Sequence, residues 1–163
     1  MMKKMIILLC ITLYSMANYA QCNDATYISK YGTYYNSKVP QMVRESYIDP
    51  VVITVEGLSY FEFGKIVISA MKSLFSKQRL KEMGSNRIIF SFYFDAIKKQ
   101  LAYVSFCCME NGEATKIPFS NEEMCLLEKY FKSKKYHFNA FYKTKSSNFT
   151  IATFGVRPSK LAE

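Results

Sequence analysis

The sequence predicts an α+β domain in which two helices pack on one face of a mostly antiparallel sheet, in the order β-α-β-β-α-β-β. Three observations carry this prediction: a β-branched run at 51–55, an alternating aromatic segment at 87–95, and a capped amphipathic helix that begins after Ser120. A sheet face and two helical stripes can share one core in this layout. The composition, 50% hydrophobic and 16% aromatic, fits a folded chain.

Residues 1–20 read as a secretory signal peptide. Lys3 and Lys4 precede a mostly apolar run at 5–16, and small residues follow it. We expect cleavage after Ala20, with Ala17 as the alternative. The apolar run is shorter than the roughly 20 residues that span a bilayer, so no transmembrane segment is expected after cleavage. Removal of these 20 of 163 residues leaves 143, and the net charge falls from +9 to +7 because both lysines are lost.

A lipid anchor on Cys22 is disfavoured by the residues in front of it. Gln21 is not small, and Tyr19 stands where an aliphatic residue would be expected. The stretch Tyr19-Ala20-Gln21 resembles the signal ends of exported proteins from Gram-negative gut anaerobes. This resemblance implies a periplasmic or secreted protein, among those exported proteins that have no assigned function.

The mature chain is expected to hold an extended Tyr-rich lead-in at 21–50, with one strand at most, a single domain at 51–158 and a tail at 159–163. Val51 to Val55 are suited to a strand. The stretch from Gly64 to Met83 has apolar residues at helical spacing, and Gly84 supplies a stop.

The next segments have the period of two that is typical of strands. Residues 87–95 place Ile88, Phe90, Phe92 and Phe94 on one face. A polar turn at 96–99 leads to a second strand at 100–109, so the two form a hairpin. Asn111-Gly112 marks the following turn.

The second helix has the clearest local signal. Ser120 and Glu123 have the spacing of a capping box, and Phe119 and Met124 that of a hydrophobic staple. Met124, Leu127 and Phe131 form an apolar stripe, and Glu128 and Lys132 are spaced for an ion pair on its flank. The helix is expected to end near Ser133. Strands at 136–143 and 149–156 follow, separated by the polar stretch 144–148, and Pro158 is expected to end the ordered part.

Residues 87–154 resemble the C-terminal domain of TonB-type proteins and their small exported relatives. The stretches that carry the resemblance are RIIFSFYFDAIKKQLAYVSF and IPFSNEEMCLLEKYFKSKKYHF. It implies a similar shape and an exposed edge strand for partner binding. The hairpin turn departs from the family, because Asp95 is followed by Ala96 rather than glycine, and the proline-rich spacer is absent. The same order of elements also fits a ferredoxin-like sandwich.

Four cysteines remain after cleavage, and three full pairings are open to them. Neighbouring residues of a strand point to opposite faces, so Cys107 and Cys108 cannot close on one metal ion. Cys108 is expected to be a buried thiol on the core face, and Cys107 to face away from it. The alternative for Cys108 is a disulfide to Cys125, which requires the second helix to pack on that core face with the two Cα atoms within roughly 7 Å.

The residue types that catalysis needs are sparse. His137 is the single histidine, and its strand pattern suits a sheet-covering residue better than a base. No serine has the glycine neighbours of a nucleophile elbow, and no phosphate-binding glycine loop occurs. Glu122 and Glu123 are explained by the helix start. We therefore predict no catalytic, cofactor or metal site.

Basic and aromatic residues gather at the end of the second helix and predict a binding surface. Export excludes nucleic acid as its partner, which leaves an envelope protein or an anionic envelope polymer. The predicted function is a non-enzymatic binding or adaptor domain of the cell envelope, acting through this surface, a sheet edge or the segment 27–47. The alternative is a small periplasmic hydrolase with an unrecognised site. The predicted surface consists of Lys129, Lys132, Lys134, Lys135, Tyr136, Phe141 and Lys143.

Overall fold

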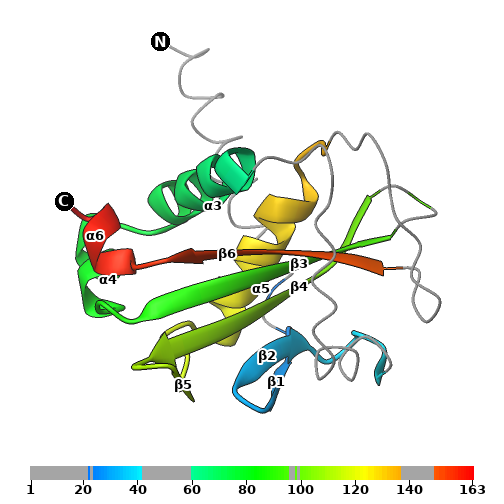
Figure 1. The fold of residues 1–163 in the computed structure, drawn as a ribbon, viewed down its shortest axis with the longest axis horizontal. Helices are drawn as coiled ribbons and strands as arrows, with labels where there is room; N and C mark the ends of the chain where they lie inside the picture. Colours follow the sequence, from blue (N-terminus) through cyan, green and yellow to red (C-terminus); the bar gives the residue numbers. More distant parts are fainter. Residues whose placement is uncertain (1–21, 23, 42–59, 96–97, 99, 137–148) are drawn as a thin grey trace, which may run out of the picture.

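The computed structural model describes residues 22, 24–41, 60–95, 98, 100–136 and 149–163, which form one antiparallel sheet with helices against it (Figure 1). The strands are β1 (Tyr27–Lys30), β2 (Thr33–Asn36), β3 (Arg87–Asp95), β4 (Gln100–Glu110), β5 (Glu113–Thr115) and β6 (Phe149–Val156). The helices are α3 (Tyr60–Leu74), α4 (Lys77–Glu82), α5 (Asn121–Lys132) and α6 (Pro158–Leu161). The α+β class and the antiparallel sheet are thus confirmed.

The sheet has the strand order β1-β2-β4-β3-β6, and β5 pairs with β4 beside β2. The long hairpin β3–β4 lies at its centre. Ile88 pairs with Cys108 and Phe90 with Phe106, so both strands present apolar side chains to the same face. The predicted alternation in 87–95 is confirmed, because Ile88, Phe90, Phe92 and Phe94 are all fully buried.

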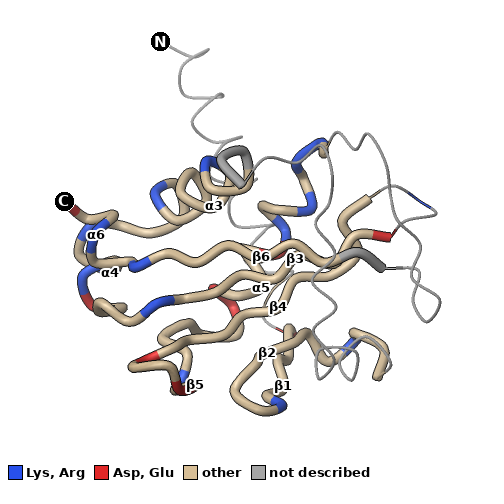
Figure 2. The backbone as a smooth tube through the Cα atoms, in the orientation of Figure 1, with Lys and Arg blue, Asp and Glu red and all other residues tan. Residues whose placement is uncertain are grey.

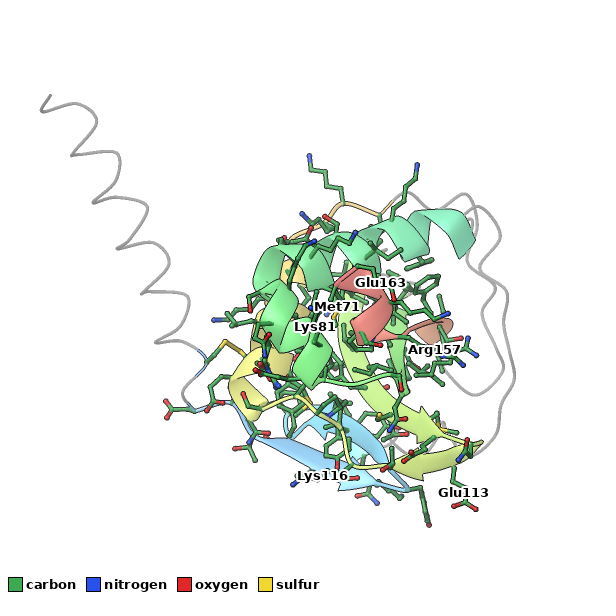
Figure 3. All side chains as sticks on the ribbon, turned by 90° about the vertical axis from the view of Figure 1, so that its left-hand side faces the viewer. Met71, Lys81, Glu113, Lys116, Arg157 and Glu163 are labelled. Atoms are coloured by element: carbon green, nitrogen blue, oxygen red, sulfur yellow. A yellow bond between two sulfur atoms is a disulfide. The ribbon has the colours of Figure 1, made fainter. Side chains whose placement is uncertain are left out.

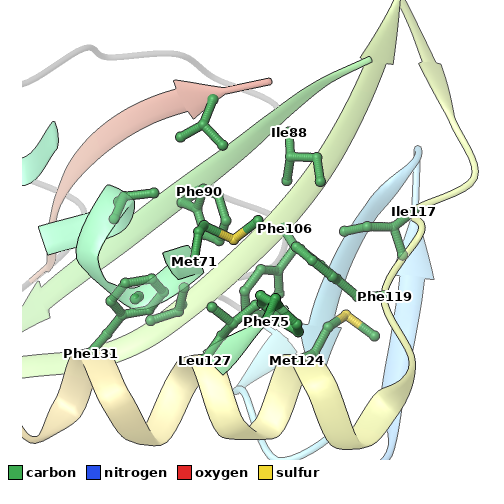
Figure 4. Close-up of a cluster of buried hydrophobic side chains, with 14 of the residues drawn as sticks. Met71, Phe75, Ile88, Phe90, Phe106, Ile117, Phe119, Met124, Leu127 and Phe131 are labelled. Atoms are coloured by element: carbon green, nitrogen blue, oxygen red, sulfur yellow. The ribbon is translucent and has the colours of Figure 1, made fainter. Parts of the chain in front are cut away.

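Helices α3 and α5 cover that face and close the main core (Figure 4). The Phe131 ring of α5 packs edge-on against Phe92, with centroids 4.9 Å apart, and against Phe90 at 5.7 Å. Met71 of α3 is fully buried in the same cluster. Apolar burial at these positions supplies the main stabilisation of the fold.

The predicted lead-in is a hairpin that belongs to the sheet. Strands β1 and β2 meet at Tyr31 and Gly32, whose φ angles of 51° and 76° form a tight turn. A Cβ atom on Gly32 would overlap the Cβ of Ala114 in β5, so this position requires glycine for space as well as for conformation. The order β-α-β-β-α-β-β, and with it the TonB-like or ferredoxin-like topology, is therefore not confirmed.

The first predicted helix is divided in two. Ser76 has extended backbone angles, and its hydroxyl accepts a hydrogen bond from the Arg79 N–H at 3.1 Å, so a new helix begins there. Gly84, with φ of 80°, ends α4 as expected. The expectation that order ends at Pro158 is wrong: Pro158 starts α6, and the Ser159 N–H donates to the Gly84 carbonyl at 3.1 Å.

The predicted cap of α5 is confirmed in detail. The Glu123 N–H donates to the Ser120 hydroxyl at 3.2 Å, and the Ser120 N–H donates to the Glu123 carboxylate at 2.9 Å. The same carboxylate receives two hydrogen bonds from the Arg79 guanidinium of α4, at 2.7 and 2.8 Å. This cap therefore also joins α4 to α5.

Several predictions fall outside the described residues: the signal peptide at 1–20, the strand at 51–55, and the strand at 136–143 beyond Tyr136. Among the described helices, none is long and apolar enough to cross a membrane.

Candidate functional site

A hollow of about 350 Å³ lies where α5 meets the two ends of the β1–β2 hairpin. The chain before β1 contributes 24–26, and the chain at the end of β2 contributes 36–38. Helix α5 contributes Cys125, Glu128, Lys129 and Lys132. We call this feature the lysine hollow, because Lys38 joins the two lysines of α5 in its wall.

A disulfide between Cys22 and Cys125 holds one wall of the lysine hollow (Figure 3). Their Cα atoms are 5.8 Å apart, and 103 positions separate them in the sequence. The bridge ties the chain in front of β1 to the first half of α5. The Cys108–Cys125 disulfide that the sequence left open is therefore not formed: Cys108 lies opposite Thr115, where β4 pairs with β5, whereas Cys125 faces the N-terminal segment.

Cys107 and Cys108 are free and buried, on opposite faces of β4. Cys108 belongs to the main core, as predicted. Cys107 points away from that core and is nevertheless buried, opposite Thr33 of β2. Burial raises the pKa of both thiols, which disfavours their thiolate form.

Glu128 of α5 lies at the centre of the second wall of the lysine hollow, and its side chain is buried. Its carboxylate forms an ion pair with the Lys132 ammonium at 2.7 Å. It also accepts hydrogen bonds from the Tyr27 hydroxyl at 2.6 Å and from the Asn36 amide at 3.3 Å. The Glu128 side chain is 8% exposed and that of Lys132 is 41% exposed, so the pair links the interior to the surface. The predicted ion pair within α5 is confirmed, and the hydrogen bonds from Tyr27 and Asn36 connect its carboxylate to the β1–β2 hairpin.

Tyr27 stays protonated beside this carboxylate. Burial, and then the negative charge of Glu128, raise the pKa of the Tyr27 phenol far above its usual value. The carboxylate thus has three donors that hold it in one position. Such a group fixes a wall, because three of its roughly four lone-pair sites are already occupied by neighbouring donors.

Basic residues occur in the last turn of α5 and just beyond its end (Figure 2). The contacts of their side chains divide the predicted basic surface between two sides of the helix. Lys129 and Lys132 line the lysine hollow. Lys134 lies over the Tyr130 ring, 4.0 Å from its centroid, on the side where the Tyr130 hydroxyl meets Ser69 of α3.

The other members of the predicted surface do not gather at the lysine hollow. Lys135 is exposed just beyond the end of α5. Tyr136 packs against Phe94, with ring centroids 5.1 Å apart, and its hydroxyl donates to the Phe131 carbonyl at 2.8 Å. Burial raises its pKa. Phe141 and Lys143 lie outside the described residues.

Sequence reasoning missed the hairpin's part in the site. Tyr27 and Asn36 come from the stretch that was interpreted as a lead-in, and Glu128 was predicted only as the ion-pair partner of Lys132 on the flank of the apolar stripe. One signal was present: Cys125, Glu128 and Lys132 recur at helical spacing beside the apolar stripe of α5. That second stripe marks a further contact of the helix.

A second hollow, of about 410 Å³, lies between α4 and the start of α5. Arg79 and Glu123 line it. The Arg79 guanidinium donates to the Glu123 carboxylate, which also accepts from the Ser120 N–H in the capping box, so both side chains are already engaged. It is therefore the weaker candidate. Within the described part of the chain, no group of three His, Cys, Asp or Glu side chains is placed to hold a metal ion. His137 lies outside that part.

Comparison with solved structures finds a similar fold in a DUF5043 family protein from Bacteroides uniformis, with a TM-score of 0.55 and 15% sequence identity. The match covers 85% of this chain and 93% of that chain. At this identity the likeness concerns the fold alone, and its source agrees with the gut-anaerobe resemblance of the signal sequence. Neither the protein-family models nor the curated proteins give a match.

Proposed function

We propose that this chain is an exported, non-enzymatic binding domain of the cell envelope, with the lysine hollow as its binding site. The observation that carries the proposal is that both walls are fixed before any ligand arrives. The Cys22–Cys125 disulfide holds one wall, and the Glu128 cluster holds the other. When the side chains of a site are already ordered before binding, less binding free energy is lost in ordering them.

Export is supported by the disulfide as well as by the signal sequence. Disulfides persist in oxidising compartments such as the periplasm and are rare in the cytosol. A lipid anchor would occupy the sulfur of Cys22, which is the atom that bonds to Cys125. The disulfide and the anchor therefore exclude each other, and this argues for a periplasmic or secreted form.

Binding fits the geometry better than catalysis does. The buried carboxylate of the site is held by Lys132, Tyr27 and Asn36, which suits a supporting role. The hydrolase alternative needs a pocket that contains His137, or a cysteine beside a carboxylate. His137 lies outside the described residues, and Cys125, the cysteine that lines the lysine hollow with Glu128, is bonded to Cys22.

The test is capture of envelope material by the mature protein, compared with a variant in which the hollow is filled. Thr26 is exposed and lines the hollow, so Thr26→Trp places an indole there without burying a new polar group. Ser29→Trp, at an exposed position of β1 outside the hollow, is the matched control. We expect retention of envelope components to be lost in Thr26→Trp and kept in Ser29→Trp. Equal retention by both variants would refute the proposed site.

A further inference from the structure

The proposed function leaves the class of ligand open. The residues that line the lysine hollow limit which classes of ligand fit. Resting on that function, we infer that the lysine hollow binds an acidic oligosaccharide segment of an envelope polymer. The inference depends on three features of the lining: its charge, its hydrogen-bonding groups and its size.

The charge of the lining favours an anion. Three lysines and two carboxylates line the lysine hollow. Glu128 is buried and paired with Lys132, so its charge is offset within the wall. With Lys38, Lys129 and Asp24 included, the three lysines and two carboxylates give the lining a formal net charge of +1. The mature chain adds to this local field, because its formal net charge after removal of residues 1–20 is +7.

The hydrogen-bonding groups favour a sugar over a peptide. Thr26 and Ser37 bring hydroxyls on short side chains, whereas the Asn36 amide is already engaged with the Glu128 carboxylate and the Lys38 N–H. The two hydroxyls match those of a sugar ring. Ala25 and Cys125 are the apolar members of the lining, and neither forms the deep aromatic or aliphatic pocket that anchors a peptide side chain.

The size of the hollow suits a short segment of a saccharide chain. Its volume of about 350 Å³ is at the low end for small-molecule sites. That is room for roughly one or two sugar rings. Because the hollow is half-open to solvent, the neighbouring rings of a longer chain can continue past it.

The test is isothermal titration of the mature, oxidised protein with four probes of similar length. Tetragalacturonate carries carboxylates, a heparin-derived tetrasaccharide carries sulfates, galactotetraose is neutral, and tetraglutamate is an acidic peptide. We expect binding of tetragalacturonate, of the sulfated probe, or of both, weakening as salt rises because the contacts are ionic. We expect neither of the other two probes to bind. The two charged saccharides distinguish uronic from sulfated polymers as the natural source.

Two double variants connect binding to the hollow. Lys38→Gln with Lys129→Gln removes two positive charges from the lining, and we expect at least a roughly tenfold loss of affinity. Lys72→Gln with Lys77→Gln removes the same charge from exposed positions of α3 and α4 and is expected to leave affinity unchanged. Thermal unfolding of each variant checks that the fold is intact.

Each other result overturns the inference. Equal binding of galactotetraose removes the role of charge, and binding of tetraglutamate alone replaces the sugar with a peptide. Equal losses in both double variants show non-specific attraction. If no saccharide binds while Thr26→Trp still abolishes retention of envelope material, only the ligand class is wrong. If Thr26→Trp has no effect, the proposed site itself fails.

Discussion

Helix α5 makes two different contacts with the rest of the molecule. Toward β3 and β4 it presents Met124, Leu127 and Phe131, which are buried among aromatic side chains. Toward the N-terminal hairpin it presents Cys125 and Glu128, which act through one covalent bond and one buried polar cluster. The first contact depends on buried area and the second on individual atoms.

The difference separates what makes the fold from what makes the site. Apolar packing tolerates exchange of similar side chains if volume is kept. A disulfide or a buried carboxylate has partners that cannot be exchanged so freely. The polar contact also forms the walls of the lysine hollow, and rigid walls are what the proposed binding site requires.

Truncation of a buried side chain in the apolar contact should cause the largest loss of stability. Phe131→Ala removes a fully buried ring, and we expect it to lower the free energy of unfolding by about 3–5 kcal/mol. Ile68→Ala, at a side chain that is 36% exposed on the outer face of α3, is the control and should cost below about 1 kcal/mol. Urea denaturation measures both. Similar midpoints for the two variants would contradict the account of the core.

The disulfide should rank second. Cys22→Ser combined with Cys125→Ser opens a loop closed across 103 positions, and we expect a loss of about 2–4 kcal/mol. Dithiothreitol should lower the stability of the natural chain by a similar amount and leave the double variant unchanged. Peptide mapping without reduction gives the direct check. A Cys108–Cys125 peptide there would overturn the pairing.

The buried carboxylate should rank third. Glu128→Gln keeps the shape but removes the charge that Lys132 and Tyr27 face, and we expect a cost of about 1–3 kcal/mol. Glu113→Gln, at an exposed position of β5, is the matched control and should be near neutral. Urea denaturation at neutral pH decides. Equal effects would mean that Glu128 is solvated like any surface residue.

The smallest effect concerns alkaline pH. The pKa of Tyr27 is raised in the folded state, so its contribution is complete below the unfolded value near 10 and is lost as pH rises above it. Stability should fall there by up to about 1.4 kcal/mol per pH unit for this residue. Tyr27→Phe should remove that part of the slope in urea titrations between pH 9 and 11. Tyr31→Phe, at the 79% exposed hairpin tip, should leave the slope unchanged.

The sequence predicts those parts of the molecule whose signals are local. The alternating phenylalanines in 87–95 predict a strand, and the capping box at Ser120 predicts the start of a helix. Each prediction needs only a few neighbouring residues, and both are confirmed. The β1–β2 hairpin was not predicted, because its strands have only four residues each and β2 carries aromatic residues on both faces. Tyr34 points to the helices and Tyr35 to the opposite face, which hides the alternation.

The candidate site is built from contacts between segments that are far apart in the sequence. For that reason sequence patterns predicted only some of its residues. Lys129 and Lys132 were predicted as binding residues, and both line the lysine hollow. Their partners could not be inferred, because Tyr27 is 101 residues from Glu128. Glycine is required at position 32 because Ala114 of another hairpin lies against it. This contact could not be inferred from the sequence either.

One measurement tests most directly the claim that the polar contact of α5 is the binding site. Amide shifts of the ¹⁵N-labelled mature protein can be followed while tetragalacturonate, or an acidic polysaccharide fraction of the envelope, is added. We expect the largest changes at 24–26, 36–38 and 128–132, which line or adjoin the lysine hollow. Changes concentrated on the exposed face of α3 around Lys72, or none at all with either ligand, would contradict the account.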